Sequence, residues 1–179
     1  LTKICHIAAQ ERCLIPGEEL FACGQKASHM YFLVGGVMEY HDSGGECQPQ
    51  EVEQGSRICE IVLWATWEHQ GRLTGKIQAE LVAIDSCKFR NIARRRSVTW
   101  HQCADYGAEY VRRFSVVCEE EHVLPDIWET GPVQLEEMVH AAFPPVALVD
   151  DNLTGVLPRL GQRWGIRAGT IGASSQHRL

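Results

Sequence analysis

The 179-residue sequence predicts an α+β fold, in which an antiparallel β-roll of the jelly-roll (double-stranded β-helix) type is followed by C-terminal helices. Up to residue 93, short apolar segments alternate with turn residues about every 8–12 positions, which is typical of antiparallel rolls. Beyond that point the apolar spacing becomes helical. We expect a roll with its helices over 1–118, an additional helical segment over 119–143, and a weakly basic, flexible tail over 144–179.

The expected strands are short segments rich in β-branched and aromatic residues, bounded by Gly, Pro or Asp. They are 20–22, 30–34, 37–40, 73–77 and 81–84. The sequence Asp-Ser-Gly-Gly at 42–45 predicts a hairpin tip. Together these segments make up the roll.

The helical part begins at Asp85 or Ser86, either of which is expected to cap a first short helix. A second, longer helix is predicted by apolar residues at alternating spacings of three and four. These are Trp100, Cys103, Gly107, Tyr110, Phe114 and Val117. Gly107 weakens a helix, so we expect it to allow close approach or bending. Residues 134–143 predict one more short helix.

The composition of the chain argues against several classes of protein: disordered chains, membrane helices, nucleic-acid-binding surfaces and metal sites. A hydrophobic content of 45% is too high for a disordered chain, and no apolar run reaches the roughly 18–20 residues of a membrane helix. The net charge of −6 argues against a nucleic-acid surface. The eight cysteines have no C-x-x-C spacing and the histidines no ligand spacing. We therefore expect free structural cysteines, no metal site and no cofactor.

Two stretches, taken together, resemble the cyclic nucleotide-binding domain family. Within 16–38 the chain carries Pro-Gly-Glu-Glu-Leu-Phe, then Gly-Gln, then Met-Tyr-Phe-Leu-Val-x-Gly-x-Met. Within 55–63 it carries Gly-x-x-Ile-Cys-Glu-Ile-Val-Leu, followed by Gly-Arg-Leu-Thr at 71–74. The resemblance covers about residues 10–118, and the architecture of the family, a β-roll followed by helices, agrees with the fold predicted above.

The resemblance implies a site for cyclic AMP or cyclic GMP. In the family, backbone N–H groups of a short helix between two strands bind the cyclic phosphate, as helix N-termini do for anions. A glutamate accepts from the ribose 2′-hydroxyl, and an arginine pairs with the phosphate. Glu60 takes the glutamate position here, and Arg72 is the nearby arginine. The candidate ligand-binding residues are Cys59, Glu60, Ile61, Val62, Arg72, Leu73 and Thr74.

This sequence departs from the family at the site itself. Cys59 replaces the family glycine, and Arg72 lies three residues later, counted from Glu60, than in the usual nucleotide binders. The insert 64–70 (Trp-Ala-Thr-Trp-Glu-His-Gln) brings Glu68 near the expected phosphate position, and its tryptophans are expected to pack rather than to stack on a base. Such lengthened segments resemble potassium channels of the ether-a-go-go type, whose domains generally do not bind cyclic nucleotides.

The main functional hypothesis is that this chain is a regulatory domain and not an enzyme. We expect it to be the gating domain of an ion channel, on the cytoplasmic side of a membrane. Binding of a ligand, or contact with another part of the protein, would move the helix near 100–118. We expect the chain to be a piece of a longer protein, with the upstream channel region and a homo-oligomer as its partners. Alternatives are a degenerate domain for assembly or self-docking, with 146–149 as an internal plug, and a cytoplasmic domain of a kinase regulatory subunit.

One further motif lies at the junction between the two expected helices. Arg94-Arg95-Arg96-Ser97-Val98 fits the pattern of basophilic protein kinases, so Ser97 is a candidate phosphorylation site. The alternative is that these arginines form a solvated basic helix end. The sequence leaves this open.

Overall fold

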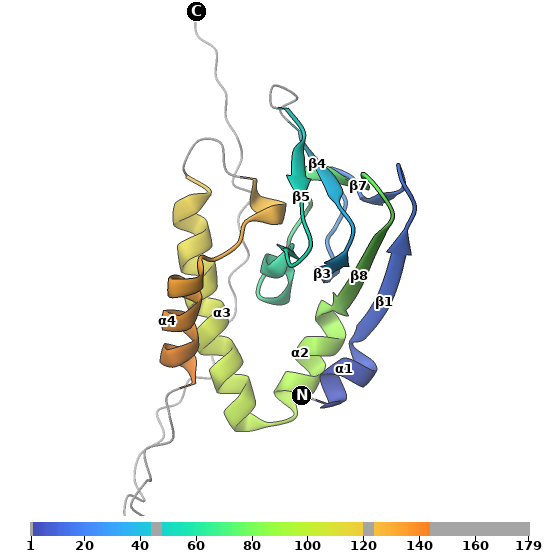
Figure 1. Cartoon of the computed structure of the whole chain (residues 1–179). Helices are drawn as coiled ribbons and strands as arrows, with labels where there is room; N and C mark the ends of the chain where they lie inside the picture. Colours follow the sequence, from blue (N-terminus) through green and yellow to red (C-terminus); the bar gives the residue numbers. More distant parts are fainter. Residues whose placement is uncertain (1, 44–47, 120–123, 144–179) are drawn as a thin grey trace, which may run out of the picture. The chain divides into compact units, whose positions relative to one another are not determined.

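The computed structural model (Figure 1) describes residues 2–43, 48–119 and 124–143, which lie within one compact unit, Leu1–Pro145. Within these described residues, eight strands form two antiparallel four-stranded sheets, ordered β1-β8-β3-β6 and β2-β7-β4-β5. They are β1 (Ala9–Leu14), β2 (Glu19–Phe21), β3 (His29–Gly35), β4 (Met38–Asp42), β5 (Gln50–Val52), β6 (Arg57–Ile58), β7 (Gly71–Gly75) and β8 (Ala79–Asp85). The predicted α+β class, a β-roll followed by helices, is confirmed.

In the same described part of the chain, six helical elements accompany the strands. They are α1 (Thr2–Ile7), the 3-10 helix η1 (Glu60–Leu63), α2 (Ser86–Arg94), α3 (Ser97–Val117), the 3-10 helix η2 (Pro125–Ile127) and α4 (Pro132–Ala142). As predicted, Asp85 caps α2: its side chain accepts a hydrogen bond of 2.8 Å from the backbone N–H of Lys88. The sequence did not predict α1 or η2. The second half of the expected hairpin tip, and all of the expected tail and plug, lie outside the described residues.

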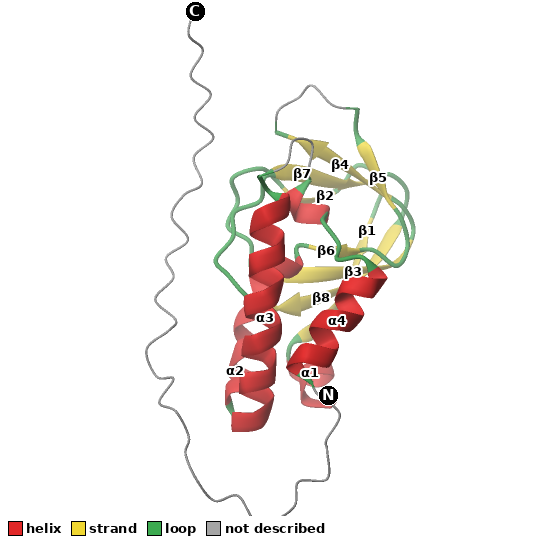
Figure 2. Ribbon diagram, turned by 90° about the vertical axis from the view of Figure 1, so that its left-hand side faces the viewer, coloured by secondary structure: helices red, strands yellow, loops and turns green. Residues whose placement is uncertain are grey.

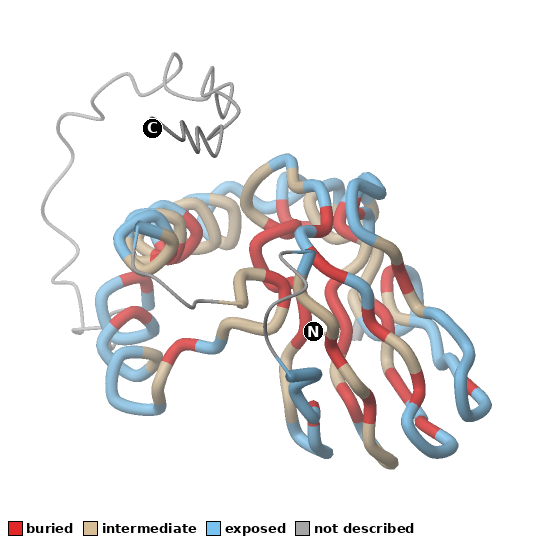
Figure 3. The backbone as a smooth tube through the Cα atoms, turned by 90° about the horizontal axis from the view of Figure 1, so that it is seen from above, coloured by how far each residue is buried: buried red, intermediate tan, exposed pale blue. Residues whose placement is uncertain are grey.

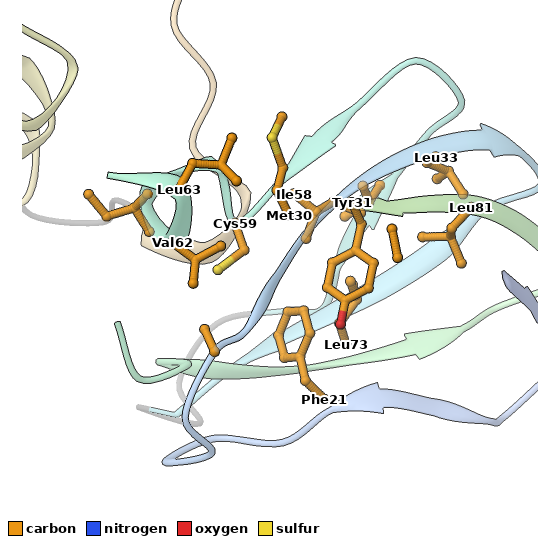
Figure 4. Close-up of a cluster of buried hydrophobic side chains, with 14 of the residues drawn as sticks. Phe21, Met30, Tyr31, Leu33, Ile58, Cys59, Val62, Leu63, Leu73 and Leu81 are labelled. Carbon is orange, nitrogen blue, oxygen red and sulfur yellow. The ribbon is translucent and has the colours of Figure 1, made fainter. Parts of the chain in front are cut away.

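The two sheets share one core, because buried and exposed residues alternate along their strands (Figure 3). Leu33 of β3 pairs in register with Leu81 of β8, and both are buried. Leu73 of β7 and Phe21 of β2 enter the same core from the other sheet (Figure 4). Cys59, which precedes η1, also lies in this core, so η1 is anchored on the roll.

Helix α3 packs against α4, and the two run side by side (Figure 2). The predicted apolar stripe of α3 is buried at Gly107, Tyr110 and Phe114, and half-buried at its outer members. A Cβ on Gly107 would lie 2.6 Å from Cε3 of Trp64, so this glycine allows close approach to the segment after η1. Among the described helices, none is long and apolar enough to cross a bilayer.

Candidate functional site

The short helix implied by the resemblance is η1, which lies between β6 and β7. All four of its residues, Glu60 to Leu63, are buried. Cys59, at its N-terminal end, adopts a left-handed conformation with φ 58° and ψ 41°. That conformation costs an ordinary residue about 1–2 kcal/mol, which explains why a glycine suits this position. The cysteine side chain is accommodated by the core, where it is 1% exposed.

Glu60 points into the protein and its carboxylate is engaged by protein groups. Tyr106 of α3 donates its hydroxyl hydrogen to Oε1 over 2.9 Å, and Arg57 Nη1 donates to Oε2 over 3.3 Å. Burial raises the pKa of Glu60, while Tyr106 and Arg57 act in the opposite direction. Glu60 therefore links the roll to α3 directly.

A second buried carboxylate, which the sequence analysis did not single out, belongs to Asp126 of η2. Its side chain is 0% exposed and accepts five hydrogen bonds. The donors are the Tyr40 hydroxyl (2.8 Å), Trp67 Nε1 (2.8 Å), His69 Nδ1 (3.1 Å) and the backbone N–H groups of Gln70 (2.7 Å) and Gly71 (3.0 Å). We call these five donors the carboxylate cradle. They satisfy both oxygens of the carboxylate.

Two donors of the carboxylate cradle lie where β7 begins, and η1 lies beside the cradle. The backbone N–H of Cys59, at the N-terminal end of η1, donates to the backbone carbonyl of Asp126 over 2.6 Å. Asp126 thus bridges η1 and the start of β7, the region that the resemblance assigns to the cyclic phosphate. Burial, together with the charge of Asp126, raises the pKa of Tyr40, which keeps its hydroxyl protonated as a donor.

Residues 124–130, which we call the docked segment, hold Asp126 in place through contacts on both sides of it. The ring of Trp128 lies 5.3 Å from that of Tyr110 and 5.5 Å from that of Phe114. On the roll side, Arg57 Nη2 donates to the backbone carbonyl of Thr130 over 3.0 Å. The docked segment therefore contacts the roll and α3 together.

The other predicted ligand-binding residues take different positions. Ile61, Val62 and Leu73 are buried in the hydrophobic core. Arg72 is exposed, because residues alternate along β7 and its neighbours Gly71 and Leu73 point inward. The structure does not bring Arg72 to Glu60, whose basic partner is Arg57. The Thr74 hydroxyl donates to the backbone carbonyl of Glu39 in the adjacent strand over 3.4 Å.

The insert 64–70 contributes to the carboxylate cradle. Trp67 and His69 both direct ring nitrogens at Asp126, while Trp64 packs against Tyr106 with ring centroids 5.3 Å apart. The tryptophans pack within the protein, as predicted. Glu68, which we expected near the phosphate position, is exposed, and it bridges to Lys26 through the backbone.

Sequence spacing alone could not have grouped these residues, because Asp126 lies 55 or more positions from its partners. The one local signal is an aspartate set among the apolar residues Leu124, Ile127 and Trp128. An acid in such a setting is buried only if it is fully hydrogen-bonded.

Cys59, His69 and Asp126 bring three ligand-type atoms within 4.8 Å of one another, a grouping that the sequence did not predict. The chemistry of the donor set does not favour a metal ion. Both oxygens of Asp126 already accept hydrogen bonds. Burial raises the pKa of the Cys59 thiol, which favours the protonated form over the thiolate that binds metals. The arrangement is that of a hydrogen-bonded carboxylate.

A cavity of about 390 Å³ lies beside the docked segment, between α3 and the start of α4. Arg112, Arg113, Trp128 and Thr130 are among its lining residues. Neither Glu60, Asp126 nor any donor of the carboxylate cradle lines it. This cavity is therefore separate from the predicted ligand site.

No family model matches the chain, and no curated protein matches it. Among solved structures, the N-terminal domain of a transcriptional regulator from Streptomyces coelicolor A3(2) is 16% identical, with 60% of this chain and 78% of that chain covered and a TM-score of 0.51. A structure from work on a cyclic-GMP-dependent signalling pathway in bacterial phytopathogenesis is 17% identical, with 68% and 93% covered and a TM-score of 0.50.

A cyclic nucleotide-binding-like protein from Brucella abortus is 27% identical over 47% of this chain and 74% of that chain, with a TM-score of 0.42. The two matches with TM-scores of 0.50 and 0.51 show the fold of this chain, but they do not show which ligand it binds. The resemblance stated from the sequence is confirmed at the level of architecture: the chain has the expected β-roll followed by helices, and it shares this fold with these two structures.

Proposed function

We propose that this chain is a regulatory domain of the cyclic nucleotide-binding type in which the docked segment occupies the position of the ligand. One observation carries the proposal: the Asp126 carboxylate is completely buried and accepts five hydrogen bonds, two of them from backbone N–H groups at the start of β7. Oriented backbone donors of this kind bind phosphate and carboxylate alike. The protein thus supplies its own anion, which favours self-docking over nucleotide sensing.

Regulation would then act through release of the docked segment. Trp128 packs on Tyr110 and Phe114, so undocking would remove two ring contacts from α3. Undocking would also free Arg57, the residue that joins Thr130 to Glu60. A ligand or a partner shifts this equilibrium only by its different affinities for the docked and undocked states.

We further propose, from the resemblance of the insert to channel-type domains, that the domain gates an ion channel as part of a longer, oligomeric chain on the cytoplasmic side of a membrane. Movement of α3 would transmit the signal to the channel. The sequence that precedes Leu1 in the full-length protein tests this setting. Six membrane spans and a pore signature there would support it, and a second domain of the same type would favour a kinase regulatory subunit.

The test of self-docking combines calorimetry with hydrogen exchange. For the unchanged protein we expect no saturable heat with cyclic AMP or cyclic GMP at millimolar concentration, and slow amide exchange in 67–71 and 124–130. Asp126→Asn should accelerate exchange in both segments. The matched control Glu136→Gln removes a charge from an exposed position on α4 and should change neither.

Two results would contradict the proposal. One is saturable nucleotide binding by the unchanged protein while 124–130 stays protected. The other is fast exchange of 124–130 in the unchanged protein, because a docked segment must be protected.

A further inference from the structure

The turn between α2 and α3 is a basic, solvent-exposed junction. Helix α2 ends at Arg94 and α3 begins at Ser97, and every residue from 94 to 98 is exposed. The Arg94 guanidinium lies over the ring of Trp100, 5.0 Å from its centroid, so a positive charge stands beside the first turn of α3. Ser97 therefore lies at an accessible helix start among three arginines.

The first turn of α3 has neither a side-chain cap nor an acidic residue for its free N–H groups. Arg96 is the N-cap residue and makes no side-chain capping bond, and no acidic residue lies in the first turn. By contrast, α2 begins with a carboxylate cap from Asp85. A positive N-cap residue also opposes the helix dipole. The longest described helix thus begins without the negative group that its neighbour carries.

A second stretch of the same type lies in the chain, and the structure distinguishes the two. Arg112-Arg113-Phe114-Ser115-Val116 has the same arrangement of two arginines, one residue, a serine and an apolar residue. It lies inside α3, where Phe114 is buried and the Ser115 hydroxyl donates to the backbone carbonyl of Val111 over 2.9 Å.

The arginines of this second stretch already form hydrogen bonds with glutamates. Arg112 Nη2 and Arg113 Nε each donate to Glu109 over 2.7 Å, and Arg113 Nη2 donates to Glu137 of α4 over 3.1 Å. The hydrogen bonds from Arg112 and Arg113 to Glu109 lower the pKa of Glu109 to about 2. For a kinase to bind this stretch in extended form, the C-terminal half of α3 would have to unfold. At the α2–α3 junction, only a short exposed turn and the adjoining helix ends would have to open.

We propose that Ser97 is a phosphorylation site for a basophilic protein kinase, and that Ser115 is not one in the folded protein. In the reaction, Ser97 Oγ attacks the γ-phosphorus of ATP. The new Oγ–P bond forms as the bond from that phosphorus to the β–γ bridging oxygen breaks. ADP leaves, and the hydroxyl proton passes to the general base of the kinase.

The phosphoryl group would supply what the start of α3 lacks. It adds about −1.5 to −2 charges and three acceptor oxygens beside Arg94, Arg95 and Arg96. It also places an anion at the positive end of the α3 dipole. We expect the first turn of α3 to exchange its amide hydrogens about two- to fivefold more slowly after modification. This proposal does not depend on the docked segment.

The test treats the folded 179-residue chain with ATP and the catalytic subunit of cyclic AMP-dependent protein kinase, a basophilic enzyme. Mass spectrometry should find one phosphoryl group, on Ser97. Ser97→Ala should abolish the incorporation, and Arg94→Gln with Arg95→Gln should lose most of it, whereas Ser115→Ala should leave it unchanged. A synthetic peptide spanning 110–118 should be phosphorylated on Ser115, because it has no helix to unfold.

The proposal fails if the folded chain accepts no phosphoryl group, or if Ser115 is labelled as fast as Ser97. It also fails if incorporation survives Ser97→Ala. Circular dichroism of each variant confirms that α3 is intact. Hydrogen exchange of 97–103, before and after modification, is a second measurement, and unchanged exchange there would refute the predicted effect on α3.

Discussion

Glu60 and Asp126 are the two buried carboxylates among the described residues, and they are held by different kinds of donor. Asp126 accepts from two backbone N–H groups and three side chains of the roll, so both of its oxygens have partners. Glu60 accepts from one side chain of α3 and one of β6. The first site holds a carboxylate among converging donors, and the second joins the roll to α3.

The largest effect is expected from emptying the carboxylate cradle. Asp126→Ala leaves five buried or half-buried donors without an acceptor, and such groups cost about 1–3 kcal/mol each when they cannot recover a partner. We expect a loss of about 3–5 kcal/mol in the free energy of unfolding, measured by urea denaturation. Glu136→Ala, exposed on α4, serves as the control and should change stability by less than about 0.5 kcal/mol. A similar small loss for both variants would show that the docked segment contributes little.

A smaller effect is expected where α3 approaches the roll beside Glu60. Gly107→Ala improves helix propensity by about 1 kcal/mol, but the new Cβ would lie 2.6 Å from the Trp64 ring. Overpacking of this kind costs about 1–3 kcal/mol. Because the ring belongs to a packed aromatic cluster, we expect a net loss of about 1–2 kcal/mol in denaturant unfolding. A gain in stability for Gly107→Ala would show that α3 and the Trp64 ring are not in close contact. Ala108→Gly, at an exposed position of the same helix, measures the propensity effect alone.

The pH dependence of stability tests the Glu60 carboxylate. Because burial raises the pKa of Glu60 above its unfolded value, the folded form binds the proton more tightly. Its contribution to stability is therefore complete at a pH below the unfolded value of about 4.3, and it is lost as the pH rises through the folded value.

Glu60→Gln removes this titration. We expect the stability of the unchanged protein, relative to Glu60→Gln, to fall as the pH is raised from acid toward neutral. Denaturant unfolding at a series of pH values measures the difference. A difference that stays constant with pH, or grows in the opposite direction, would contradict the raised pKa.

The smallest effect is expected at Arg72, which the resemblance placed at the phosphate. Arg72 is exposed on the outer side of β7, so Arg72→Gln should change the free energy of unfolding by less than about 0.5 kcal/mol. It should also leave amide exchange at Gln70 and Gly71 unaltered. Arg57→Gln is the informative counterpart, because it removes the bonds to Glu60 and to the docked segment. If Arg72→Gln and Arg57→Gln changed stability and amide exchange equally, Arg57 would not be the basic residue that holds the site together.

Much of the roll could be predicted because its signals are local. Aromatic and branched residues at 30–34 and 81–84 mark β3 and β8, and Asp85 marks the start of α2. The alternating spacing of the apolar stripe marks α3, although the helix begins at Ser97, earlier than the first stripe residue. Glu60 was identified because it follows a short sequence pattern that resembles a known family.

The sequence by itself determined the roll and the helices that follow it, because side-chain periodicity and turn residues act over a few positions. The family resemblance singled out Glu60, but its burial against Tyr106 is seen only in the structure. Only the tertiary structure brought Asp126 to its five donors. The donors of the carboxylate cradle lie between residues 40 and 71, and their acceptor lies at 126. The docked segment reaches them by packing Trp128 on α3, a contact between residues that only the fold brings together. A buried carboxylate is stable only where all its donors converge, and that convergence is a property of the folded chain.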